Sequence, residues 1–125
     1  MKPIFIYSDT ILNMLSWFMR VGGISLFPIV ILREKHKDPI HVGGFEQSQR
    51  IHRHETIHFQ QQLEMLVIPF YVWYLIEYLV KLVIYGSFKK AYRNISFERE
   101  AYSNEDNFKY LHYRKRYNWI KLLKQ

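Results

Sequence analysis

Two histidines and a glutamate form the pattern HExxH at residues 54 to 58. These residues are His54, Glu55 and His58 in the stretch HETIH. The surrounding residues 47–66 are mostly good helix formers and include no Gly or Pro, so they predict a helix. Residues four apart on a helix are rotated by about 40° and rise by about 6 Å. Both imidazoles therefore reach one metal ion from the same helix face.

Glu55 lies on the neighbouring side of that helix face, where it can contact a water on the metal without binding the metal itself. Zn²⁺ lowers the pKa of such a water towards about 7. Glu55 can then take the proton and pass it to a leaving amine. The motif predicts Zn²⁺ as cofactor, His54 and His58 as ligands and Glu55 as the catalytic residue. The alternative for so short a motif is a solvated helix with two incidental histidines.

The extended stretch HETIHFQQQ, residues 54–62, resembles small bacterial HExxH domains in which Gln residues follow the second His. Over about residues 24–104 the chain is similar to a minimal zinc metallopeptidase of the gluzincin type. In that family a Glu from a later helix is the third ligand, and a strand beside the active-site helix often binds the substrate backbone. The resemblance implies hydrolysis of a peptide or protein substrate, bound along residues 26–32.

Two glutamates compete for the position of third ligand. Glu98 opens the sequence EREA, which resembles the ExxA pattern of membrane zinc peptidases; there the small residue, here Ala101, lets the ligand helix pack closely. Those peptidases often carry an Asp that braces a His ligand, and Tyr102 stands at that position here. Glu77 lies at the interval from the second His that several aminopeptidase-like gluzincins show. Both candidates need the chain to turn back near Pro69. We favour Glu98 and expect Glu77 to be a structural partner.

The composition limits the architecture to one domain, residues 1–125, that is mainly α with a small β-hairpin (α+β) around a minimal zincin-like core. The chain has no Cys, which excludes disulfides, thiol catalysis and Cys-ligated metals. Residues 24–32 predict an edge strand because they include Pro28, and residues 40–42 predict its partner. Helices are expected over residues 10–19, 70–85 and 96–102, with Asp9 and Ser96 as N-caps. Residues 88–94 read as a basic connection, and residues 108–125 as a final helix or a helix with a tail.

Residues 65–86 are apolar almost throughout, with Glu77 and Lys81 as their charges. Their length suits a core helix, an oligomer interface or membrane contact. The rival to the peptidase is therefore a non-enzymatic membrane-associated or partner-binding protein that works through this segment and the basic C-terminal tail. No convincing signal peptide is evident at the start, so we expect a cytoplasmic or membrane-associated protein. The net charge is +7, yet no specific nucleic-acid motif is recognisable.

Overall fold

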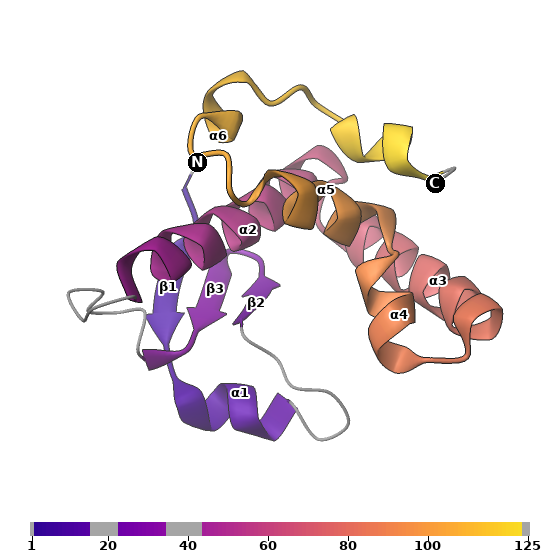
Figure 1. Cartoon of the computed structure of the whole chain (residues 1–125), viewed down its shortest axis with the longest axis horizontal. Helices are drawn as coiled ribbons and strands as arrows, with labels where there is room; N and C mark the ends of the chain where they lie inside the picture. Colours follow the sequence, from indigo (N-terminus) through magenta and orange to yellow (C-terminus); the bar gives the residue numbers. More distant parts are fainter. Residues whose placement is uncertain (1, 16–22, 35–43, 124–125) are drawn as a thin grey trace.

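The computed structural model describes residues 2–15, 23–34 and 44–123 (Figure 1). The protein is mainly helical with a small three-stranded sheet, as the sequence predicts. The elements in chain order are β1 (Ile4–Tyr7), α1 (Asp9–Leu15), β2 (Gly23–Leu26), β3 (Ile29–Leu32), α2 (Gly44–Glu64), α3 (Ile68–Tyr85), α4 (Phe88–Arg93), α5 (Ser96–Asn104), α6 (Tyr110–Tyr113) and the 3-10 turn η2 (Asn118–Leu122).

The sheet has the order β1-β3-β2, with β1 parallel and β2 antiparallel to the central strand β3. The prediction of one strand over residues 24–32 is wrong, since these residues form both strands of a tight hairpin. Phe27 and Pro28 make its turn, where the missing N–H of Pro28 breaks no ladder bond. The predicted partner strand, residues 40–42, lies outside the described residues. The strand β1 was not predicted.

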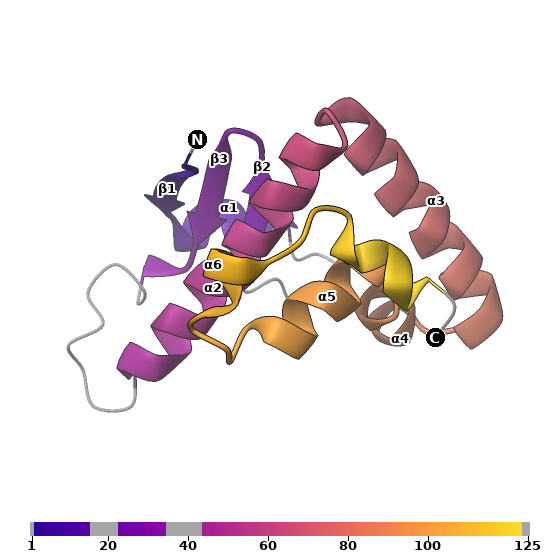
Figure 2. The same cartoon turned by 90° about the horizontal axis from the view of Figure 1, so that it is seen from above.

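Helix α2 lies at the centre of the molecule, between the sheet and α5 (Figure 2). Towards α5, Ile57 of α2 packs in one buried cluster with Ala101 and Tyr110. Ala101 is fully buried, so its small side chain allows α5 to lie close to α2. Because α2 is held from two sides, the side chains at residues 54–58 have fixed surroundings.

The chain turns back between α2 and α3, as the two third-ligand candidates require. Leu66 and Val67 make this turn with φ values of 59° and 66°, a left-handed region that is unusual for non-glycine residues. Pro69 falls in the first turn of α3, where proline is tolerated because that N–H has no partner within the helix. The helix α3 ends at Gly86, which has φ 63° and donates its N–H to the carbonyl of Leu82.

Several local expectations need correction. Residues 88–93 form the helix α4, because Ser87 caps it by accepting the N–H of Lys90. Helix α1 is capped by Ser8, which accepts the N–H of Ile11, whereas Asp9 lies in the first turn. In place of the predicted final helix or helix with a tail, the described residues 108–123 form the short helix α6 and the 3-10 turn η2. The larger core cluster joins α3 and α5 to η2 through Phe70, Phe97 and Trp119.

Candidate metal centre

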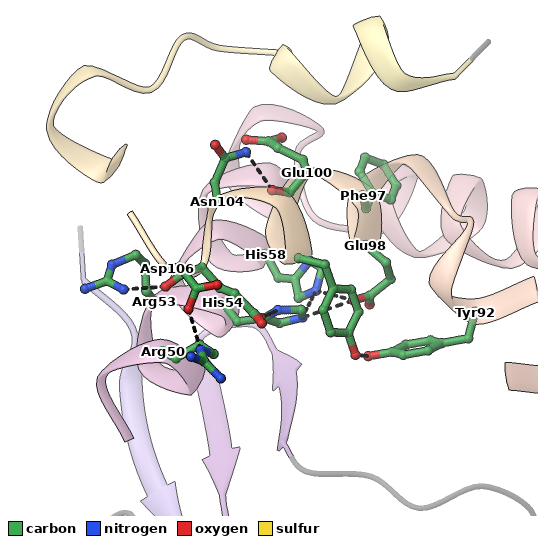
Figure 3. A network of polar contacts seen from close by, with 12 residues as sticks. Arg50, Arg53, His54, His58, Tyr92, Phe97, Glu98, Glu100, Asn104 and Asp106 are labelled. Atoms are coloured by element: carbon green, nitrogen blue, oxygen red, sulfur yellow. Dashed lines mark hydrogen bonds and ion pairs between the residues drawn. The ribbon is translucent and has the colours of Figure 1, made fainter. Parts of the chain in front are cut away.

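Three predicted residues meet at one point between α2 and α5 (Figure 3). The Nε2 atoms of His54 and His58 are 3.2 Å apart, and Oε1 of Glu98 lies 3.1 Å from the first and 3.0 Å from the second. All three side chains are buried, with 3–5% of each residue exposed. Two imidazole nitrogens and one carboxylate oxygen form the donor set of catalytic zinc sites, which leave a fourth position for water.

The hydrogen bonds of Gln61 fix the tautomer of His58. The amide nitrogen of Gln61 donates to the carbonyl oxygen of Phe97 at 3.1 Å and to Oε1 of Glu100 at 3.0 Å. A carbonyl oxygen and a carboxylate oxygen are both hydrogen-bond acceptors, so the nitrogen of the amide must face them. The Gln61 Oε1 atom therefore faces His58 and accepts its Nδ1–H at 2.8 Å. With its proton on Nδ1, a neutral His58 presents the lone pair of Nε2 to the centre.

Glu105 has the same effect on His54. Its carboxylate accepts the Nδ1–H of His54 at 2.7 Å, which directs the His54 Nε2 atom at the same point. The backbone carbonyl of Glu105 is in turn bound by Arg53. Tyr102, at the position where the resemblance suggested an Asp, makes a T-shaped ring contact with His54, with 4.5 Å between ring centroids. The brace on His54 therefore comes from Glu105.

The remaining oxygen of Glu98 is held by α3. Its Oε2 atom accepts a 2.7 Å hydrogen bond from the hydroxyl of Tyr74, so only Oε1 faces the two histidines. Glu98 also lies in the first turn of α5, where the positive end of the helix dipole favours a carboxylate. Each of the three candidate ligands thus has a second partner that orients it.

The charges of the centre favour a cation. Burial lowers the pKa of His54, but the hydrogen bonds with Glu105 and Glu98 outweigh it and raise that pKa to about 10. Burial also lowers the pKa of His58, yet the charge of Glu98 raises it above its usual value. Burial raises the pKa of Glu98, and the two imidazoles more than offset this, so that it lies well below its usual range. The site therefore retains protons on its histidines until a metal ion displaces them.

Glu55 lies beside this centre and does not join it. Burial raises the pKa of its carboxyl group, which both histidines partly offset. Within the described part of the chain no hydrogen bond ties its carboxylate, in contrast to Glu98 and Glu105. A Cβ added at Gly23 would lie 3.3 Å from Oε1 of Glu55, so the start of β2 borders the acid. A buried carboxylate with a raised pKa is suited to general acid–base work.

The structure places Glu77 away from the histidines. Its carboxylate accepts both the backbone N–H and the hydroxyl of Ser96, the latter at 2.6 Å, and also the indole N–H of Trp73 at 3.1 Å. It therefore satisfies the start of α5, where the predicted Ser96 cap is wrong because Ser96 is itself the first helical residue. The expectation that Glu77 has a structural role fits these contacts.

The predicted substrate strand, residues 26–32, does not exist as one strand. Most of it is β3, which is paired on both sides. The outer strand β2 is tied to the helices at Ser25, whose carbonyl accepts from Gln62 at 2.8 Å and from Tyr71 at 3.2 Å. What lies next to Glu55 is the other end of β2, at Gly23.

Sequence reasoning missed the residues that orient the ligands: Gln61, Tyr74, Glu100 and Glu105. Two signals were available. Gln61 lies one helical turn after His58, and Glu105 follows Glu98 by seven residues, which returns to the same helix face. Comparisons with family models, with curated proteins and with solved structures find no match for this chain.

Proposed function

We propose that the protein is a zinc-dependent metallopeptidase. The observation that supports this most is the convergence of His54 Nε2, His58 Nε2 and Glu98 Oε1, all within 4.8 Å of one another, with the carboxylate of Glu55 beside them. Each ligand is oriented by a separate partner, which is typical of a preformed metal site. Two imidazoles and one carboxylate suit Zn²⁺, so zinc is the metal we expect.

When bound, zinc would polarise the scissile carbonyl and make a water nucleophilic near neutral pH. Glu55 would take the proton released as the water attacks the carbonyl carbon, and then give it to the leaving amine as the C–N bond breaks. Glu105 and Gln61 would hold the imidazoles in place through the reaction. A peptide substrate would lie with its main chain beside Gly23, at the end of β2 that borders Glu55.

A second candidate function is a non-enzymatic membrane-associated protein. It is supported by α3, the one helix in the described residues that is long and apolar enough to cross a membrane. Membrane association is compatible with either function, but only the peptidase requires the metal. Zinc content therefore separates the two candidates.

The decisive experiment measures metal and hydrolysis together. We expect the purified protein to hold about one zinc per chain by elemental analysis and to cleave members of a library of quenched fluorogenic peptides. Glu55→Gln should retain the zinc and lose cleavage, since it removes the proton acceptor and no ligand. Glu98→Gln should weaken zinc binding by more than the roughly 10- to 100-fold that is typical of changing a residue that only orients a ligand.

Glu77→Gln tests the other candidate for third ligand, because it neutralises a buried glutamate that binds Ser96 and not the histidines. It should lose much less zinc affinity than Glu98→Gln, although it also weakens the start of α5. Absence of zinc from the wild-type protein, together with no effect of His54→Ala on metal content, would favour the non-enzymatic function. Equal loss of zinc from the Glu77 and Glu98 variants would remove the assigned third ligand.

A further inference from the structure

The outward face of α3 lacks the polar residues expected of a helix on the surface of a water-soluble domain. The inward face combines the core residue Phe70 with polar groups, among them Tyr74, which binds Glu98, and Glu77, which binds Ser96. The outward face is apolar from Ile68 to Ile84, and Val83 is 86% exposed. A solvated helix has its polar residues outside, so water is not the natural surroundings of this face.

The outward face is continuous over the whole helix. Leu75, Ile76, Leu79 and Val80 are each more than half exposed in its middle. Eighteen residues span about 27 Å at about 1.5 Å per residue. Figure 2 shows α3 along one outer side of the molecule, with α4, α5 and η2 on its inner side. An apolar surface of this length exceeds the scattered exposed side chains of ordinary monomers and marks an interaction site.

The charges around this face have one sign. Glu77 is the only acidic residue in residues 66–97, and it is buried and bound to Ser96. The helix that follows α3 carries Lys89 and Lys90, both exposed, just beyond the C-terminal end of this face. The guanidinium of Arg93 lies over the ring of Tyr102 instead. An apolar strip that is followed at one end by exposed cations matches the boundary between acyl chains and anionic headgroups.

We propose that the outward face of α3 inserts into the interfacial layer of an anionic lipid bilayer, with the helix lying in the membrane plane. A position across the bilayer is disfavoured, because the inward face of α3 packs on α4 and contacts α5, and α2 beside them is polar. Pairing with a second copy of the chain is the alternative occupant that the experiment below distinguishes.

Docking by this face would place the metal centre near the membrane surface, because Tyr74 on the opposite face of the same helix contacts Glu98. The docking itself does not depend on the proposed hydrolysis. It can therefore be tested with no knowledge of a substrate.

The test is flotation of the full-length protein with lipid vesicles at about 0.1 M salt. We expect the protein to float with vesicles of phosphatidylcholine containing about one-third phosphatidylglycerol, and to bind pure phosphatidylcholine about tenfold less. The double variant Leu79→Glu and Val83→Glu should reduce partitioning at least tenfold, or about 1.4 kcal/mol, since two carboxylates would enter the apolar layer. Both positions are exposed, so the fold should persist in circular dichroism.

The matched control is Met14→Glu with Phe108→Glu, which places two charges on exposed apolar residues outside α3. It should float like the wild type. Trp73, which is 40% exposed at the edge of this face with its indole N–H on Glu77, adds a measurement on the otherwise unaltered protein: vesicles with brominated acyl chains should quench its emission, and Trp73→Phe should remove most of that quenching. Failure of the wild-type protein to float would overturn the proposal, as would equal losses in the two double variants. A dimer that Leu79→Glu and Val83→Glu separate, without any vesicle binding, would assign the face to a second copy.

Discussion

At the scale of single residues, the candidate centre depends on side-chain oxygens that accept a hydrogen bond from Nδ1 of each histidine. A carboxylate oxygen of Glu105 accepts at Nδ1 of His54, so this nitrogen carries a proton. The amide of Gln61 is turned by Glu100 and by the carbonyl of Phe97, so Nδ1 of His58 must carry one as well. Both Nε2 atoms therefore face the same point as Glu98, and a metal ion that displaces their protons would meet both lone pairs there.

We expect Glu105→Gln to weaken zinc binding by about 10- to 100-fold, the usual effect of losing a partner that orients a ligand. The neutral amide can still accept the His54 Nδ1–H, but it supplies no charge to make the imidazole more basic. Competition with a chromophoric zinc chelator measures the change. Asp106→Asn is the matched control, because this neighbour is exposed and pairs with Arg50 at 2.5 Å, away from the centre. Zinc binding weakened equally by both changes would show a general charge effect in place of a specific brace.

The two histidines of the candidate centre could be brought together from the sequence alone, because they lie four apart on one helix. Glu98 was favoured over Glu77 through a resemblance, the ExxA pattern that ends at Ala101. The bracing residues depend on how α2 and α5 are placed against each other, which one sequence does not encode locally. Glu105 shares a face with Glu98, but only the approach of α5 to α2 shows which histidine it reaches.

At the scale of elements, the turns decided how well the fold could be predicted. Pro28 was interpreted as part of an edge strand, whereas it forms the turn of a hairpin and divides residues 24–32 into β2 and β3. The turn between α2 and α3 uses Leu66 and Val67 in a left-handed conformation. Propensity argues against both residues there, so only tertiary packing specifies the turn. The helices themselves, α2 and α3, followed from composition alone.

Glu77 connects α3 to the start of α5, the helix that carries Glu98. The carboxylate of Glu77 accepts the first N–H of α5 and the hydroxyl of Ser96. We expect Glu77→Gln to lower the free energy of unfolding by about 1–2 kcal/mol. The variant loses the negative charge that complements the dipole of α5, and the NH2 group of its amide replaces one of the oxygens that accept from Ser96. Ser96→Ala should cost less, because the backbone N–H keeps its acceptor. Urea unfolding of the metal-free proteins measures both, and a larger loss in Ser96→Ala would contradict this account.

At the scale of the whole molecule, Arg114 ties the C-terminal segment to both central helices. Its guanidinium pairs with Glu64 at the end of α2 and with Glu100 of α5, and its side chain is only 3% exposed. Glu64 also accepts the backbone N–H of Tyr117 at 2.6 Å. Since Glu100 is the residue that orients Gln61, this buried network reaches the metal centre from residues that lie far along the chain.

Removal of the cation would leave two buried carboxylates without their partner. We therefore expect Arg114→Met to lower the free energy of unfolding by about 3–5 kcal/mol, a large share of the roughly 5–15 kcal/mol that holds a domain of this size together. Arg114→Lys should recover part of the loss, because an ammonium group restores the charge but not the fork of donors. Urea unfolding in the presence of a chelator measures these values, with the exposed Arg116 changed to Met as control; this control should stay within about 0.5 kcal/mol of the wild type. If Arg114→Met also stayed within that range, the ion pairs of Arg114 would not contribute to stability. The packing of α2 on α5 would then depend on their apolar contacts alone.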